Sequence, residues 1–285
     1  MLRALFIAVF FFTMTPLLIS IQWLLGKLGL PGWGFICSNY YRVLAALLRI
    51  RVRIVGMPVR DRAVLFVSNH VSWVDIVAIG SLRPVAFVAK SEVVKWPLVG
   101  ITAKMQRTVF VDRTRRHQSA DAVAQIADRL KGGTPVVLFA EGTSSDGNRV
   151  LPFRSALLGA VEAAAKHGGE AGRILIQPMS ICYTTQHGIA MNRQQRPLVA
   201  WYGDLDFMPH IKALIQQGAI DAVVSYGEPV PADRNISRKE LTRRLEAEVR
   251  RMTASVLRGR PVPRVPVLKE PASAAEAAPA PSPTG

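Results

Sequence analysis

The sequence is short of cysteine and of acidic residues. Its only two cysteines, Cys37 and Cys182, lie far apart and show none of the short spacings of metal sites, which argues against a disulfide framework and a zinc site. Asp and Glu number 20 against 36 Lys and Arg, so the formal net charge is +16. So basic a chain suits an anionic partner, which can be nucleic acid, an anionic membrane surface, or an acidic substrate or carrier.

Charge is also missing near the start of the chain. Leu5 to Leu25 contains no charged residue, and as a helix it would be about 31 Å long, enough for a hydrocarbon core of about 30 Å. No A-x-A-like site follows, which argues against a cleaved signal peptide. Pro16 lies near the middle and can kink the helix. A second largely apolar segment, Phe35 to Leu48, follows, so we expect a two-helix membrane anchor, spanning or embedded.

The rest of the chain divides into two parts. Residues 51–260 alternate strand-like and helix-like segments, which predicts an α/β domain behind the anchor at residues 1–50. Residues 261–285 hold seven of the 19 prolines, with Ala and Ser, and are typical of a disordered tail. The expected strands are 51–55, 63–67, 85–89, 108–111, 136–139, 174–178, 198–201 and 223–225. The expected helices are 73–81, 95–105, 119–130, 155–166, 210–217 and 238–257.

One turn of the chain carries residues suited to proton transfer. His70 and Asp75 follow the apolar run 63–67 and precede a helical segment, so one turn can bring them face to face. Imidazole is the side chain best suited to accept a proton near neutral pH, and a carboxylate beside it fixes its tautomer and stabilises the imidazolium. Taken alone, the pattern is equally that of a strand-to-helix turn with an acid at the helix start.

Two further polar stretches follow predicted strands. Residues 112–117 are rich in arginine, and arginines such as Arg113 can hold a phosphate through paired hydrogen bonds. The sequence Glu141-Gly142-Thr143-Ser144 follows strand 136–139 and combines an acid, a glycine and hydroxyls, with Arg154 nearby. Such groups at the carboxyl end of a strand suit a ligand site in an α/β sheet. Without context, each stretch is also typical of an ordinary solvated loop.

The order of these stretches resembles the glycerolipid acyltransferase family, and the bacterial 1-acylglycerol-3-phosphate acyltransferases in particular. The matching blocks occur in the family's order over roughly residues 50–230. The resemblance implies a mixed α/β sheet flanked by helices. The four blocks are Asn69-His70-x4-Asp75, Phe110-x-Asp112-Arg113, Phe139-x-Glu141-Gly142-Thr143 and a strand containing Pro178.

The resemblance also implies roles for individual residues. His70 would be the general base that deprotonates an acceptor hydroxyl, and Asp75 would orient it. The acyl chain would pass directly from a thioester of coenzyme A or acyl carrier protein to the hydroxyl, with no cofactor and no metal. The domain would act on membrane lipids, at the cytoplasmic side of the inner membrane and without nucleic acid. The implied substrate-binding residues are Asn69, Lys104, Arg113, Glu141, Gly142, Thr143, Ser144 and Arg154.

The sequence departs from the family pattern where the acceptor would bind. The family usually reads F-P-E-G-T-R-S, whereas Ala140 and Ser144 replace the proline and the arginine here. A missing arginine removes a natural phosphate clamp, which Arg149 or Arg154 can restore, or else the acceptor has no phosphomonoester. From the resemblance as a whole we expect 1-acyl-sn-glycerol-3-phosphate as acceptor, giving phosphatidic acid. The missing arginine makes lyso-ornithine lipid or another lysophospholipid the alternative.

Three rival interpretations remain at this stage. A serine hydrolase would use Ser68 or Ser72 beside His70, but no G-x-S-x-G sequence is present. A metal site would use His70, Asp75 and His117, without any familiar ligand spacing. A non-enzymatic, membrane-bound lipid-binding protein would have no need of His70 or Asp75.

Overall fold

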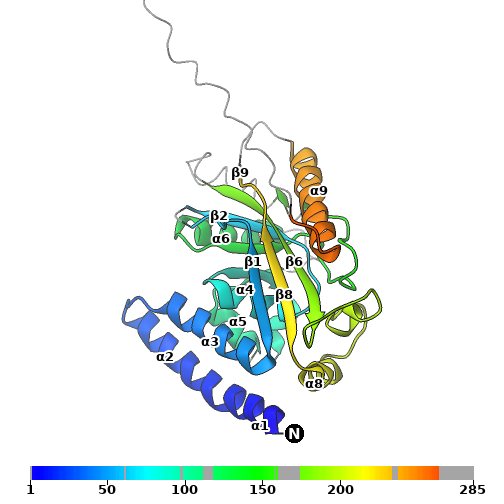
Figure 1. Ribbon diagram of the computed structural model, residues 1–285. Coiled ribbons are helices and arrows are strands. Elements are labelled where there is room, and N and C mark those ends of the chain that lie inside the picture. Colours follow the sequence, from blue (N-terminus) through cyan, green and yellow to red (C-terminus); the bar gives the residue numbers. More distant parts are fainter. Residues whose placement is uncertain are drawn as a thin grey trace, which may run out of the picture.

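A mixed β-sheet forms the centre of the computed structural model (Figure 1), which describes residues 2–60, 62–96, 99–111, 118–156, 158–159, 174–232 and 237–262. In this part of the chain the strands lie in the order β1-β8-β6-β2-β5-β3-β4, with β7 and β9 paired to β6. The strands are β1 (Ile50–Val55), β2 (Val64–Ser68), β3 (Ala86–Lys90), β4 (Val109–Val111), β5 (Val136–Phe139), β6 (Leu175–Gln186), β7 (Ile189–Ala190), β8 (Ile220–Tyr226) and β9 (Val230–Pro231).

The middle of the sheet is parallel and buried on both faces. β2 runs parallel to β5 and to β6, and β3 runs parallel to β5 and β4. β8 is antiparallel to β6 and carries β1 on its outer side. Every residue of β2 is buried, as expected of a parallel strand covered by helices on both faces.

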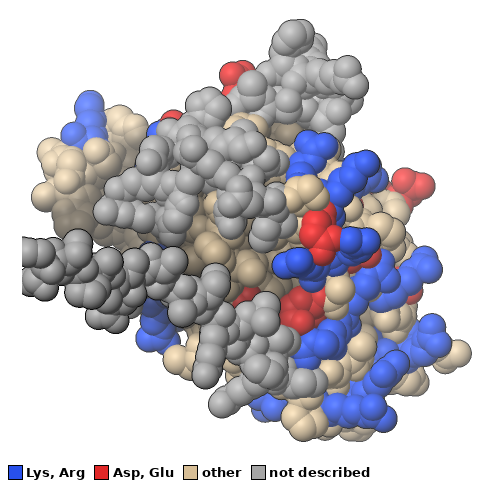
Figure 2. All heavy atoms as spheres, turned by 90° about the horizontal axis from the view of Figure 1, so that it is seen from above, with Lys and Arg blue, Asp and Glu red and all other residues tan. Residues whose placement is uncertain are grey.

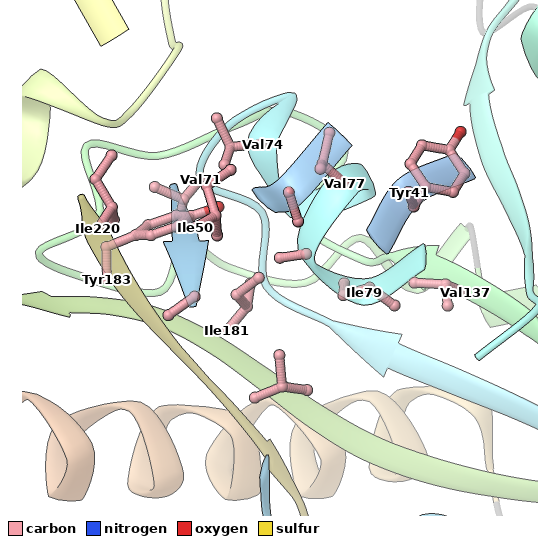
Figure 3. Packing of buried hydrophobic residues seen from close by; sticks show 14 of the residues in the cluster. Tyr41, Ile50, Val71, Val74, Val77, Ile79, Val137, Ile181, Tyr183 and Ile220 are labelled. Atoms are coloured by element: carbon pink, nitrogen blue, oxygen red, sulfur yellow. The ribbon is translucent and has the colours of Figure 1, made fainter. Parts of the chain in front are cut away.

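Two hydrophobic cores lie on the two faces of this sheet. Val64 and Phe66 of β2 point into one core, whereas Leu65 and Val67 point into the other, since side chains alternate along a strand. The first core includes residues of α3 (Trp33–Leu48), α4 (Val74–Leu82) and α8 (Phe207–Gln217), and Figure 3 shows its packing around α4. The second includes residues of α6 (Gln118–Lys131) and α9 (Arg238–Leu257).

The first apolar segment forms one long helix that the rest of the molecule barely covers. It consists of α1 (Leu2–Val9), a π-helical turn (Phe10–Met14) and α2 (Thr15–Lys27). Its most apolar 18-residue window has a mean hydropathy of 2.3 and only 6% of that window is buried, so the helix has the length and composition to cross a membrane. Pro16 lacks a backbone N–H, and the π-helical turn just before it lets the helix continue without a break.

The second apolar segment forms α3, one side of which packs into the protein. Tyr41 and Leu48 are buried, and a Cβ atom added to Gly80 of α4 would lie 2.6 Å from the Tyr41 ring. The two helices therefore touch closely. A two-helix anchor is not confirmed, since in the described part of the chain only the Leu2–Lys27 helix is long and apolar enough to span.

Most of the other expected elements are present. Seven of the eight expected strands form, but the strand expected at 198–201 is wrong: a 3-10 turn (Arg196–Leu198) includes its first residue, and residues 199–201 lie in no strand. The helix expected at 95–105 is shorter, because α5 (Val99–Met105) follows a separate 3-10 turn (Ser91–Lys95). Most of the helix expected at 155–166, and residues 263–285 of the tail, lie outside the described residues.

Candidate active site

The candidate site lies where β2 and β5 end side by side. Ser68 of β2 pairs with Phe139 of β5 in parallel register, and the Ala140 N–H then donates to the Ser68 carbonyl at 3.0 Å. The loops that leave these strands start next to each other at the carboxyl edge of the sheet. This is the edge at which α/β proteins bind their ligands.

His70 and Asp75 form a hydrogen-bonded pair. His70 Nδ1 lies 2.7 Å from Asp75 Oδ2, and the same oxygen accepts the backbone N–H of Val71 at 2.7 Å and of Ser72 at 3.1 Å. The Asp75 side chain is fully buried, whereas 20% of the His70 side chain is exposed. Asp75 therefore holds the imidazole by Nδ1 and leaves Nε2 for a substrate.

Residues of strand β6 hold both Asp75 and the loop that carries His70. The Tyr183 hydroxyl donates to Asp75 Oδ1 at 2.7 Å, so both carboxylate oxygens are engaged. The Asn69 side chain donates to the Ile181 carbonyl and accepts from the Ile181 N–H, both at 2.9 Å. Asn69 is buried and extends the hydrogen bonding between β2 and β6 past the strand end. It fixes the loop that carries His70.

An aromatic ring supports the other side of the imidazole. Phe139 stacks on His70 with ring centroids 4.0 Å apart and planes inclined by 17°, and Phe87 stacks behind Phe139. Together with the Asp75 hydrogen bond, this contact leaves the ring little freedom to turn.

The loop after β5 lies against the histidine loop. The Ser145 N–H donates to the His70 carbonyl at 2.8 Å, and the Arg154 N–H donates to the Ala140 carbonyl at 2.8 Å. Gly142 has a φ of +73°, a conformation that a side chain disfavours. The glycine of the E-G-T sequence thus makes the turn that folds this loop back toward His70.

Glu141 lies beneath this loop rather than on its surface. The carboxyl group is buried, and its Oε1 accepts the Leu151 N–H at 3.2 Å. Oε2 has no hydrogen-bond partner among the described residues. Burial raises the pKa of Glu141 to about 9, although the N–H groups of Leu151 and His70 act in the opposite direction. A neutral Glu141 can bridge the two ends of the loop without the cost of a buried charge.

The two hydroxyl residues of the loop differ in exposure. Thr143 is exposed at the tip and is available to a ligand. Ser144 stands where the family usually has arginine, and its hydroxyl donates to the Trp201 carbonyl. The Trp201 N–H in turn donates to the Val71 carbonyl at 3.0 Å. The segment around Trp201, which the sequence predicted as a strand, therefore ties the loop after β5 to the loop that carries His70.

The other predicted binding residues are more scattered. Arg154 is exposed at the base of the loop, with its Nε 3.3 Å from the Glu141 carbonyl. Lys104 is exposed on α5, which packs against α2, and none of its described contacts reaches the His70 loop. Arg113 and His117 lie outside the described residues.

The structure bears on the serine hydrolase interpretation, whereas the metal site expected at His70, Asp75 and His117 is not tested, because His117 lies outside the described residues. The side chains of Ser68 and Ser72 are fully buried, so neither hydroxyl can reach a substrate as the structure stands. Within the described residues there is no group of three or more His, Cys, Asp and Glu side chains that could hold a metal ion. The partly exposed His70 side chain beside the buried Asp75 carboxylate suits general-base catalysis at a bound hydroxyl.

Sequence reasoning missed three supporting residues. Phe139 stood within a quoted motif but received no role, Tyr183 lay beyond the expected end of its strand, and Trp201 was assigned to a strand. Only the motif position of Phe139 carried a signal, because the other two reach the site through tertiary contacts.

Comparisons with known proteins identify the family and agree with this fold. The Acyltransferase family model matches residues 49–182. The chain is 47% identical to the lyso-ornithine lipid O-acyltransferase of Brucella abortus over 86% of this chain and 92% of that one. It is 42% identical to the enzyme of the same name from Rhizobium meliloti, over 85% and 82%. The crystal structure of the 1-acyl-sn-glycerophosphate acyltransferase PlsC from Thermotoga maritima matches with a TM-score of 0.53 at 21% identity, over 85% and 96%.

The similarity assigns the chain to a family and an activity. The chain belongs to the glycerolipid acyltransferase family and is an acyltransferase. The interpretation as a non-enzymatic lipid-binding protein is thereby set aside. The likeness to the Thermotoga maritima structure confirms the mixed α/β sheet flanked by helices.

Proposed function

We propose that this protein esterifies the free hydroxyl of a lyso-ornithine lipid with a fatty acyl group from a thioester donor. The observation that carries the choice of acceptor is the similarity to the Brucella abortus enzyme along nearly the whole of both chains. This reverses the order of our expectations, which placed 1-acyl-sn-glycerol-3-phosphate first.

The loop after β5 supports the same acceptor. A phosphomonoester is best held by an arginine fork, and position 144 carries a serine whose hydroxyl is engaged by Trp201. Arg149 and Arg154 are the described cations that follow in sequence, and Arg154 contacts the loop backbone through Nε. An acceptor without a phosphate has no need of the missing arginine.

The reaction follows from the geometry of the pair. His70 Nε2 takes the proton of the acceptor hydroxyl while Asp75, 2.7 Å from Nδ1, stabilises the imidazolium. The oxygen attacks the thioester carbonyl carbon, so a C–O bond forms and the C–S bond breaks. The imidazolium then returns the proton to the departing thiolate. Asn69, Gly142 and Thr143 would shape the loops around the acceptor.

The donor and the location complete the proposal. Acyl-CoA or acyl carrier protein would supply the acyl chain, and no cofactor would be needed. The apolar helix Leu2–Lys27 would hold the enzyme at the inner membrane, with the α/β domain on the cytoplasmic side, where these donors occur.

An acceptor panel tests this function. Purified protein in detergent is supplied with labelled acyl-CoA or acyl carrier protein and with lyso-ornithine lipid or 1-acyl-sn-glycerol-3-phosphate. We expect transfer to the first and little to the second. The Ser144→Arg variant, which restores the usual arginine, should gain transfer to the phosphate acceptor. Wild-type transfer to 1-acyl-sn-glycerol-3-phosphate alone would refute the choice of acceptor.

A further inference from the structure

Three polar residues form a connected group beside the histidine loop. Asn148 Nδ2 lies 3.3 Å from Asp146 Oδ2, and the Asn148 N–H donates to Asp146 Oδ1 at 3.0 Å. On its other side, Arg196 Nη1 donates to Asn148 Oδ1 at 3.0 Å. The Asn148 amide thus stands between a carboxylate and a guanidinium. We call Asp146, Asn148 and Arg196 the polar triad.

The two charges of the polar triad do not neutralise each other. An arginine next to a carboxylate normally forms a direct, forked pair, yet within the described ranges no ion pair joins Asp146 to Arg196 or to any other residue. Arg196 Nη2 donates to the Met191 carbonyl at 3.1 Å, while its buried Nε has no partner among the described residues. Asp146 accepts hydrogen bonds from Asn148 and Arg196 donates to neutral oxygens, so neither charge is bonded to an opposite charge within the described ranges, and both side chains are half-buried.

The triad is close to the catalytic pair. Ser145, which precedes Asp146, donates its N–H to the His70 carbonyl. Gly147 has a φ of +77°, and a Cβ atom added there would lie 3.2 Å from Val71 and 3.7 Å from Arg196. The backbone between Asp146 and Asn148 therefore packs directly against the residue that follows His70. Asp146, the first residue of the triad, directly follows Ser145, and consecutive Cα atoms are about 3.8 Å apart. The triad therefore begins next to the residue that is hydrogen-bonded to His70.

We infer that the polar triad binds the zwitterionic head group of the acceptor and so decides which lysolipid is acylated. Ornithine joined to a lipid through one of its two amines keeps a carboxylate and an ammonium group. Arg196 would bind the carboxylate, Asp146 would bind the ammonium, and Asn148 would hold the two apart at the spacing of the ligand. The inference rests on the proposed function, because it needs an amino-acid head group.

The same residues would disfavour the competing acceptor. A glycerol phosphate head group carries only negative charge, so Asp146 would repel it while Arg196 attracts it. Specificity often needs such a repulsive contact as well as an attractive one. The missing arginine at 144 and the presence of Asp146 would then both disfavour a glycerol phosphate head group.

The test compares variants that each lack one charged side chain with acceptors that each lack one charged group. The acceptors are lyso-ornithine lipid, the same lipid with its carboxylate converted to a carboxamide, and the same lipid with its amine acetylated. Wild type should lose about 10-fold to 100-fold in kcat/KM with each altered lipid, the range for one charged hydrogen bond. Arg196→Gln should use the parent and the carboxamide equally, and Asp146→Asn should use the parent and the acetylated lipid equally.

Controls separate this role from a structural one. Arg53→Gln and Asp204→Asn, at exposed positions, should keep the wild-type preferences. Arg196→Lys keeps the charge and should recover part of the preference for the free carboxylate. If wild type does not acylate lyso-ornithine lipid, the proposed function fails. If wild type acylates it and the two triad variants keep wild-type preferences among the three lipids, the proposed function stands and the triad inference is wrong.

Discussion

Asp75 accepts hydrogen bonds from four groups, and these define how firmly the catalytic pair is held. His70, Val71 and Ser72 share Oδ2, and the Tyr183 hydroxyl binds Oδ1. An amide in place of the carboxylate can stabilise no imidazolium. Asp75→Asn should therefore lower the rate of acyl transfer by about 10²–10⁴-fold. Steady-state kinetics of the folded variant measure this, and a loss below tenfold would contradict the assigned role of Asp75.

Tyr183→Phe is a milder change to the same carboxylate. It removes one hydrogen bond and keeps the ring, so the rate should fall by roughly 3-fold to 10-fold, the range for one ordinary hydrogen bond. A Tyr183→Phe loss as large as that of Asp75→Asn would mean that Tyr183 itself takes part in the chemistry.

Glu141 should make stability depend on pH. Its pKa is about 9 in the folded protein against an ordinary value of 4.5, so between these values the unfolded chain releases a proton that the folded protein keeps. Stability from this group is thus full below pH 4.5 and falls by about 1.4 kcal/mol per pH unit up to about 9. Glutamine does not titrate. The free energy of unfolding of Glu141→Gln should therefore increase relative to that of wild type as pH rises.

Urea unfolding of both proteins at about pH 6 and about pH 8 measures that difference. The gap in free energy of unfolding should move by up to about 3 kcal/mol in favour of the variant. A gap that does not change with pH would show that Glu141 is ionised in the folded protein.

At the residue scale, the sequence predicts the acid-base pair but not its surroundings. His70 and Asp75 are local in sequence, and their motif precedes Glu141-Gly142-Thr143 in a recognisable order. Tyr183 lies 108 positions from Asp75 and reaches it only because β6 pairs with β2. Nothing local marks such a contact, so it could not be predicted.

Among the elements, α3 shows what composition alone leaves open. A core helix and a membrane helix are both apolar, and their sequences can look alike. The decisive contact is the approach of α3 to α4, where the Tyr41 ring leaves no room for a side chain at Gly80. The strands, by contrast, were predicted well, because β2 and β5 are short apolar runs bounded by polar turns.

The contact between these two helices gives a stability prediction. Gly80→Ala should lower the free energy of unfolding by about 1–3 kcal/mol, because the added methyl group meets the ring of a buried tyrosine. Phe35→Ala on the outer face of α3, where Phe35 is 77% exposed, should change it by less than about 0.5 kcal/mol. Denaturant unfolding of both variants checks this. Equal effects would mean that α3 is not docked in the core.

The whole molecule presents two contrasting surfaces. The apolar helix Leu2–Lys27 forms one outer side in Figure 1, and Leu17 and Leu24 on it are each 50% exposed. Figure 2 shows the side seen from above in Figure 1, where Lys and Arg side chains gather with Asp and Glu between them. On α9 several of these charges pair along the helix, as Arg244 does with Glu240 at 2.8 Å, which is typical of a solvated face.

Membrane association should therefore depend on the apolar side. Changing both Leu17 and Leu24 to Asp should move most of the protein from the membrane fraction to the soluble fraction, since charges within such a helix oppose insertion. Arg243→Gln on the exposed face of α9 serves as the matched surface control and should leave the distribution unchanged. Flotation with lipid vesicles measures both. Unchanged flotation of the double variant would assign membrane binding to another surface.

The central claim is that His70 removes the proton from a lysolipid hydroxyl, and one measurement tests it directly. Purified wild type and His70→Ala, both shown to be folded by circular dichroism, are given labelled acyl donor and lyso-ornithine lipid, and the labelled product is counted. We predict transfer by wild type and a loss of at least about 10²-fold in the variant. Transfer by His70→Ala at the wild-type rate would contradict the mechanism.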